Sequence, residues 1–253
     1  MLQKQFVSLF LIMFMYKPIL IEARIFNFFE RTIFGKNIAN NEGYQELCNE
    51  IKEYFDISQD HKLYYARWPW TYFSSFTLHT GTWINKSVWD ELDINEQIYT
   101  MYHEIAHKAL AHPLKQYTRI LSTLLLFGFI FYTMNAWNKK PLDNLIRKII
   151  VNKWGPQAIK TPVILQIINC IFVPITILAI TFIAASSFAK YCEQEADEKA
   201  AIALCEQDRN DIVENQINYL ETIEQEQGNI SSIFFPSIHS QIQYLKKIVK
   251  RYS

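Results

Sequence analysis

The chain has 253 residues, and its 25 lysine and arginine residues balance 25 aspartate and glutamate residues, so its formal net charge is zero. This balance gives no sign of a strongly basic surface, and we expect no nucleic-acid partner. Half of the residues are hydrophobic, and the length allows either one large domain or a domain with membrane segments.

The N-terminal segment contains the first apolar run. Lys4 precedes a run at residues 6–16 that is short for a membrane span and resembles the hydrophobic region of a signal peptide. Residues 21–23 match a cleavage site only poorly. We therefore expect residues 1–23 to be either a signal peptide or an uncleaved N-terminal membrane anchor.

A helix and three short strands are predicted before residue 90. Apolar residues recur at helical spacing over residues 41–56. Aromatic and β-branched residues, interrupted by turn formers, predict strands at residues 62–66, 75–80 and 82–87. An exposed edge strand here can hold an extended peptide by main-chain hydrogen bonds, or it can serve only to support the next helix.

The segment HEIAH at residues 103–107 is the most informative part of the chain. Asp93 and Glu96 match a capping box at the start of a helix, and apolar residues then recur at helical spacing. Pro113 marks the expected end of this helix, or a kink in it. The two histidines of the segment are therefore predicted to lie one turn apart on a helix.

His103 and His107 share one helical face, because residues four positions apart lie above one another. Both imidazoles can therefore reach one metal ion. Glu104 projects about 100° around the axis from His103, where it can hold a metal-bound water. The alternative interpretation is a surface helix that carries two histidines and no metal.

Two long runs without a charged residue follow, at residues 120–137 and 161–189. Both reach the length needed to cross the hydrocarbon core of a membrane. We expect them to form a transmembrane helical hairpin, joined by a linker at residues 138–160. A pair of buried core helices is the alternative.

The segment EQEAD at residues 193–197 offers a third metal ligand, and helical geometry distinguishes its two glutamates. Glu193 shares a face with Asp197, two alanines and a leucine, whereas Glu195 lies on another side and can pair with Lys199 in solvent. We therefore expect Glu193 to be the ligand. We also expect Asp197 to accept a hydrogen bond from the non-ligating nitrogen of a metal-bound histidine. A charged helix that faces solvent and binds no metal is the alternative.

The two motifs, HEIAH at 103–107 and EQEAD at 193–197, resemble those of a family of integral-membrane zinc endopeptidases that includes bacterial HtpX and the CAAX prenyl protease. These enzymes are gluzincins with the pattern HExxH followed by ExxxD. The resemblance extends from about residue 62 to the C-terminus, and only the two motifs are specific.

The resemblance implies one Zn²⁺ per chain, bound by His103, His107 and Glu193, with Glu104 as the general base. It also makes the segment GTWIN at residues 81–85 similar to the edge strand that precedes the metal helix in this family.

The C-terminal region departs from the family pattern. Many members have His-Pro followed by Arg-Ile, where this chain has FP at 235–236 and QI at 241–242. This difference concerns transition-state stabilisation more than zinc binding. His239 can take over a polar role near the site or remain exposed. His112, five residues after His107, matches a histidine often found there, and we expect it to support the site without binding metal.

These observations predict an α+β fold that is mainly helical. We expect a zincin-like metalloprotease domain with a small β-sheet next to the HExxH helix, interrupted by the transmembrane hairpin. The first part of the peptidase domain would occupy residues 24–118, the hairpin residues 119–189, and the second part residues 190–253.

The predicted function is zinc-dependent hydrolysis of peptide bonds by a membrane-bound endopeptidase, with Glu104 acting on a zinc-bound water. Its substrates would be unfolded or membrane-associated polypeptides. Two alternatives remain: a non-catalytic membrane chaperone or adaptor that retains the fold, and a non-haem iron enzyme with two histidines and one carboxylate.

We expect an integral membrane protein in contact with the lipid bilayer. The linker at 138–160 has six basic residues and one acidic residue, so the positive-inside rule places it in the cytoplasm and the catalytic helices on the extracytoplasmic side. Basic residues also flank the other ends of the two spans, and the HtpX-like relatives suggest the opposite orientation.

Overall fold

The computed structural model describes residues 30–58, 60–67, 75–78, 80–137, 148, 152, 162–229 and 235–253, without the side chains of 131–137 and 162–174. The predicted signal peptide or anchor at residues 1–23 and most of the predicted linker lie outside these residues. The described residues are mostly helical, with one small mixed sheet, in agreement with the predicted mainly helical α+β class.

The chain divides into two compact units. The first comprises the described parts of Met1–Pro113, Cys192–Ser232 and Pro236–Ser253, and the second comprises those of Leu114–Tyr191 and Ile233–Phe235. The sheet and both predicted metal motifs belong to the first unit.

The sheet has three strands, β1 (Lys62–Tyr65), β2 (Ser75–Thr77) and β3 (Gly81–Ile84), in the order β1-β3-β2. β3 runs parallel to β1 and antiparallel to β2, and all four of its residues are buried. The prediction that residues 81–85 form the edge strand is therefore wrong, since β3 is central. The outer side of β1 is bridged by Ile38, so β2 is the edge strand with no strand beside it among the described residues.

Burial of Trp83 explains why β3 lies in the centre. Its ring stacks between those of Tyr64 and Phe76, with centroids 5.1 and 5.7 Å away, and its indole N–H donates to the carbonyl of Gly35 at 2.9 Å. The rings on the two flanking strands thus cover both sides of the Trp83 ring.

The helices α3 (Glu42–Tyr54) and α5 (Ile94–Ala109) pack against each other, and α5 also packs against β2 of the sheet. The capping box predicted at the start of α5 is confirmed. The Glu96 backbone N–H donates to the Asp93 side chain at 2.8 Å, and the Asp93 N–H donates to the Glu96 side chain at 2.9 Å. Residues 85–87, predicted as strand, instead begin the short helix α4 (Lys86–Trp89) because the Asn85 side chain caps it.

The end of α5 differs from the prediction. The helix stops at Ala109, Ala111 adopts a left-handed conformation with φ of 54°, and α6 (His112–Trp137) starts immediately afterwards. Pro113 therefore lies in the first turn of a new helix, where its missing N–H costs no hydrogen bond.

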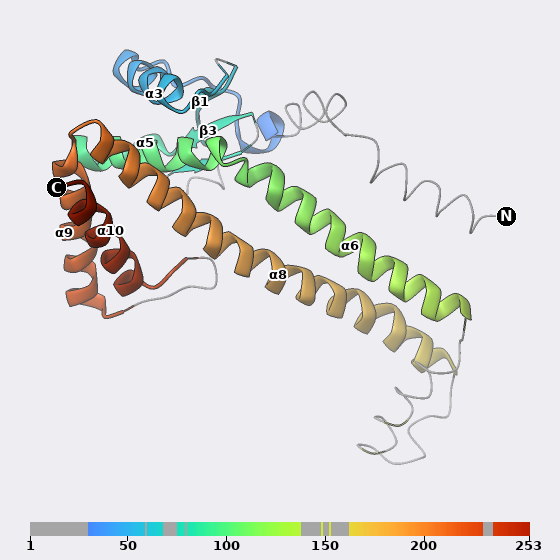
Figure 1. Cartoon of the computed structure of the whole chain (residues 1–253). Coiled ribbons are helices and arrows are strands. Elements are labelled where there is room, and N and C mark those ends of the chain that lie inside the picture. The colour runs from blue at the N-terminus through green and yellow to red at the C-terminus, as the bar shows by residue number, and fades with distance from the viewer. Residues whose placement is uncertain are drawn as a thin grey trace. The chain divides into compact units, whose positions relative to one another are not determined.

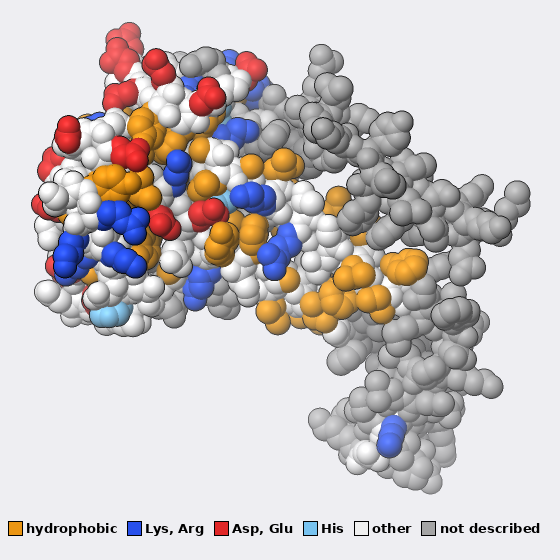
Figure 2. Space-filling view, in the orientation of Figure 1, with side chains coloured by type: hydrophobic (Ala, Val, Ile, Leu, Met, Phe, Trp, Pro, Cys, Tyr) orange, Lys and Arg blue, Asp and Glu red, His pale blue; other side chains and the backbone are white. Residues whose placement is uncertain are grey.

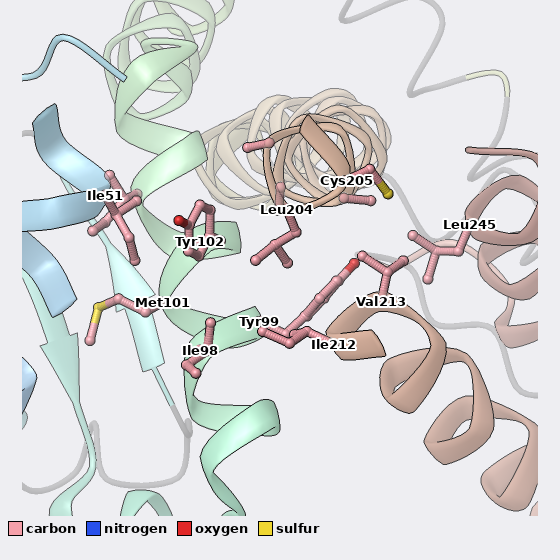
Figure 3. Close-up of a cluster of buried hydrophobic side chains, with 14 of the residues drawn as sticks. Ile51, Ile98, Tyr99, Met101, Tyr102, Leu204, Cys205, Ile212, Val213 and Leu245 are labelled. Atoms are coloured by element: carbon pink, nitrogen blue, oxygen red, sulfur yellow. The ribbon is translucent and has the colours of Figure 1, made fainter. Parts of the chain in front are cut away.

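The core of the first unit lies where α5 meets the end of α8 (Pro162–Glu206), α9 (Asn210–Gln227) and α10 (Ile238–Tyr252). Figure 3 shows the side chains of Tyr99, Leu204, Val213 and Leu245 converging from these helices. Each such buried side chain contributes about 1.5–3 kcal/mol relative to exposure. Side chains of α5, which carries the HEIAH motif, and of the end of α8, which carries EQEAD, thus belong to one core cluster.

The second unit consists of most of α6 and the first part of α8 (Figure 1). Within the described residues, one helix is long and apolar enough to cross a membrane, Ile175–Glu206, and 17% of its most apolar stretch is buried. Figure 2 shows hydrophobic side chains gathered on the surface of these long helices. Leu178 and Ile183 are 61% and 64% exposed.

Candidate metal centre

Three side chains from two helices converge in the first unit. The Nε2 atoms of His103 and His107 lie 3.1 Å apart. The Glu193 carboxylate approaches both of them, with Oε2 3.3 Å from Nε2 of His103 and Oε1 3.5 Å from Nε2 of His107. This group of two histidines and one glutamate can hold a metal ion.

The donor atoms lie close enough together to surround one small ion. Ligand bonds of about 2.0–2.1 Å at tetrahedral angles place neighbouring donor atoms about 3.3–3.4 Å apart. The Nε2 atoms of the two histidines lie 3.1 Å apart, and each lies 3.3 or 3.5 Å from a different oxygen of Glu193. With one donor atom taken from each residue, the three atoms lie within 4.8 Å of one another. The three side chains are 11–22% exposed, so solvent reaches the centre.

The face of the EQEAD helix that was predicted to point inward is buried. Ala196, Asp197, Ala200 and Leu204 are all buried on the same side as Glu193. From this face the Glu193 carboxylate reaches both imidazoles of α5.

Asp197 binds the outer nitrogen of one imidazole, as the helical spacing predicted. Nδ1 of His103 donates to Oδ1 of Asp197 at 2.7 Å. Two tyrosines that the sequence reasoning missed donate to the same carboxylate, Tyr99 to Oδ1 at 3.2 Å and Tyr244 to Oδ2 at 2.5 Å. Tyr99 could have been found, because it lies one turn before His103 on α5. Tyr244 comes from α10, and no local pattern indicates its contact.

The pKa values of these groups follow from burial and from the Asp197 charge. Burial alone would lower the pKa of His103, but Asp197, its hydrogen bond and Glu193 together raise that pKa well above its ordinary value. Burial and then the Asp197 charge raise the pKa of Tyr99 and of Tyr244. Both phenols therefore remain protonated and act as donors.

Glu104 is 6% exposed. Its Oε1 accepts a hydrogen bond from the Ser75 hydroxyl on β2 at 2.8 Å. The sequence reasoning missed Ser75, because the contact depends on β2 packing against α5. The edge strand is thereby linked directly to this carboxylate.

His112 and Glu195 form a second chain of contacts behind the histidines. Nδ1 of His107 lies 2.9 Å from Nδ1 of His112, and Nε2 of His112 lies 2.9 Å from Oε2 of Glu195. The predicted pairing of Glu195 with Lys199 in solvent is wrong, because the break at Ala111 turns His112 toward Glu195. The Lys199 ammonium instead lies over the ring of Phe55, 5.6 Å from its centroid.

Two other histidines lie apart from the centre. His239 is at the start of α10, where its ring contacts Glu224 and its backbone N–H donates to Asn229. It therefore takes no part in the site as described. His61 is buried beside Thr82 in the sheet.

The hydrogen bonds around the centre assign the imidazole tautomers. Since His103 donates through Nδ1 to a carboxylate, a neutral His103 presents a lone pair at Nε2. A neutral His112 that donates to Glu195 accepts from Nδ1–H of His107, so Nε2 of His107 also presents a lone pair. Two lone pairs and a carboxylate within 3.5 Å repel one another unless a proton or a cation lies between them. The donor set therefore fits a bound metal.

Comparison of the chain with models of protein families, with curated proteins and with solved structures gives no match. The geometry of the centre therefore carries the functional argument by itself.

Proposed function

We propose that the chain is a membrane-bound zinc metalloendopeptidase with a zincin-like catalytic domain. The observation that carries the proposal is the convergence of His103, His107 and Glu193 on one point, with the buried carboxylate of Glu104 on the adjoining residue of the metal helix. Two imidazoles, one carboxylate and an open side are the ligand set of catalytic zinc in peptidases.

A zinc ion held by these three side chains would supply a Lewis acid that lowers the pKa of bound water and polarises the scissile carbonyl. Glu104 would accept the proton of the attacking water and deliver it to the leaving amine. The Ser75 hydroxyl would hold the Glu104 carboxylate in one orientation. Asp197 would hold the His103 ring and stabilise its lone pair toward the centre.

The substrate class follows from the edge strand. Among the described residues no strand pairs with the outer side of β2, and its Ser75 contacts Glu104. An extended polypeptide that paired with β2 would bring its peptide bonds close to the proposed base. Unfolded or membrane-associated polypeptides can adopt this extended form.

The proposal includes insertion into a lipid bilayer. The exposed aliphatic side chains of Ile175–Glu206 favour lipid over water. The basic linker at residues 138–160 favours a cytoplasmic linker and an extracytoplasmic catalytic site. Labelling of a cysteine introduced into the linker with a membrane-impermeant reagent would test this orientation: labelling from outside intact cells contradicts it.

The decisive variant is Glu104→Gln, which retains the shape of the side chain and removes its basicity. We expect the purified variant to bind one zinc ion per chain, as the parent does, and to lose cleavage of an unfolded substrate such as casein. Glu91→Gln, at an exposed position before α5, is the matched control and should cleave like the parent. Cleavage by Glu104→Gln at the parental rate would exclude Glu104 as the base.

The same preparation separates the two alternative functions. Iron in place of zinc after aerobic purification would favour an oxygen-activating enzyme. Stoichiometric zinc without cleavage of any unfolded substrate would favour a non-catalytic chaperone or adaptor.

A further inference from the structure

We infer that Glu195 is a positioning residue of the metal centre and that it acts on His107 through His112. The inference rests on the proposed metal centre and adds a residue that the HExxH and ExxxD motifs leave without a role. Its basis is an unbroken series of contacts from the Glu195 carboxylate, through both nitrogens of His112, to the outer nitrogen of His107.

The backbone is shaped to make this series possible. On a continued helix, residue 112 would lie about 140° around the axis from residue 107, on a different face. The left-handed conformation of Ala111 interrupts the helix, and the His112 ring lies 5.0 Å from that of His107. A non-glycine residue in this conformation costs about 1 kcal/mol or more. This unfavourable conformation occurs at the position where the chain brings the His107 and His112 rings together.

Burial makes the contacts of His112 specific. The residue is 2% exposed, so water cannot replace either of its partners easily. A neutral imidazole has one donor and one acceptor nitrogen, and a carboxylate can only accept. Donation from Nε2 to Glu195 therefore makes Nδ1 of His112 the acceptor for His107, which directs the Nε2 lone pair of His107 toward Glu193.

The arrangement gives each metal histidine its own carboxylate from a single helix. Asp197 binds the outer nitrogen of His103 directly at 2.7 Å, and Glu195 reaches that of His107 through one intervening ring. Glu193, Glu195 and Asp197 are alternate residues of α8. One segment of helix thus supplies a ligand and holds both of the other ligands in orientation.

The test measures zinc affinity by competition with a chromophoric chelator, independently of proteolysis. His112→Phe retains a ring and removes both nitrogens, and Glu195→Leu removes the acceptor. We expect each variant to bind zinc about 10- to 100-fold more weakly than the parent, as is typical when a partner of a metal-binding histidine is lost. Glu195→Gln should recover part of the affinity, because its amide oxygen still accepts from His112.

The double variant His112→Phe/Glu195→Leu shows whether Glu195 acts through His112 or whether the two residues affect zinc affinity independently. If Glu195 acts through His112, Glu195→Leu should have no further effect on zinc affinity in the His112→Phe background. Glu198→Leu is the matched control, since it makes the same change at an exposed position of the same helix, and it should bind zinc like the parent. The visible spectrum of the cobalt-substituted protein should change in Glu195→Leu and not in Glu198→Leu.

Each outcome has a distinct meaning. Parental zinc affinity in Glu195→Leu, or losses that add up in the double variant, would overturn the role of Glu195 and leave the metal centre intact. A parent protein that binds no divalent metal would overturn the metal centre and this inference with it. Thermal unfolding of the metal-free variants shows whether each has folded before its affinity is compared.

Discussion

Nδ1 of His103 and Oδ1 of Asp197 lie 2.7 Å apart, although the two residues are 94 positions apart in the chain. The contact joins α5 to the end of α8, and the same carboxylate accepts from tyrosines on α5 and on α10. Asp197 thus connects three helices of the first unit at the point where they surround the candidate metal centre.

Replacement of Asp197 by alanine should destabilise the protein as well as the centre. The change leaves the buried Tyr99 hydroxyl, the partly buried Tyr244 hydroxyl and the His103 N–H without their acceptor, and each such loss costs about 1–3 kcal/mol when the group is buried. We expect the free energy of unfolding to fall by about 3 kcal/mol or more, measured by denaturant titration in detergent. Glu198→Ala, on the exposed side of the same helix, should change it by less than about 0.5 kcal/mol. Equal stability of the two variants would show that the tyrosines find other partners.

Ser75→Ala should lower the rate of proteolysis without releasing metal. The variant loses the hydrogen bond to Glu104, and this bond does not involve any of the three proposed metal ligands. We expect kcat to fall by about 3- to 10-fold with unchanged zinc stoichiometry, since a hydrogen bond to a charged group contributes about 1.5–3 kcal/mol at most and water can replace part of it. Ser240→Ala, at an exposed position of α10, serves as the control. A loss of zinc from Ser75→Ala would place the residue in the metal centre itself.

Zinc affinity should decrease as the pH is lowered. In the metal-free protein, Asp197 and Glu193 overcome the effect of burial and raise the pKa of His103 above its ordinary value, so the imidazole holds its proton to a higher pH than a free histidine does. Zinc must displace that proton. At pH values below the raised pKa of His103, one proton must leave this imidazole for each zinc ion that binds. We therefore expect the zinc affinity to fall about tenfold for each unit by which the pH is lowered. Isothermal titration calorimetry in buffers of different ionisation enthalpy measures the proton release; zinc binding without any release would contradict the assignment.

Ala111→Gly should stabilise the protein, unlike most glycine substitutions. Ala111 has φ of 54°, a conformation that glycine adopts without steric cost. We expect the free energy of unfolding to rise by about 0.5–1 kcal/mol. Ala109→Gly is the control, because Ala109 is the last residue of α5 with ordinary helical geometry, and it should destabilise by about 0.5–1 kcal/mol. The opposite order of the two variants would mean that residue 111 is not left-handed in solution.

The sequence by itself determined the local part of the site. A capping box, two histidines four positions apart and a face of small residues around Glu193 are features of single helices, whose geometry repeats every few residues. From them the ligand set of His103, His107 and Glu193 could be predicted, and so could the contact of Asp197 with an outer imidazole nitrogen. Helical periodicity selected Glu193 over Glu195 within its own segment, whereas the meeting of the two segments was predicted from the need for a third ligand and from the resemblance to the HExxH and ExxxD pattern.

Only the tertiary structure decided which strand lies at the sheet edge, that Ser75 holds Glu104, that Tyr244 reaches Asp197 and that Glu195 faces His112. These contacts join segments that are distant in the chain, or depend on a single backbone angle at Ala111. Helical or strand periodicity contains no information about either, because it describes one element at a time. The neighbours of each face are set by the packing of the whole unit.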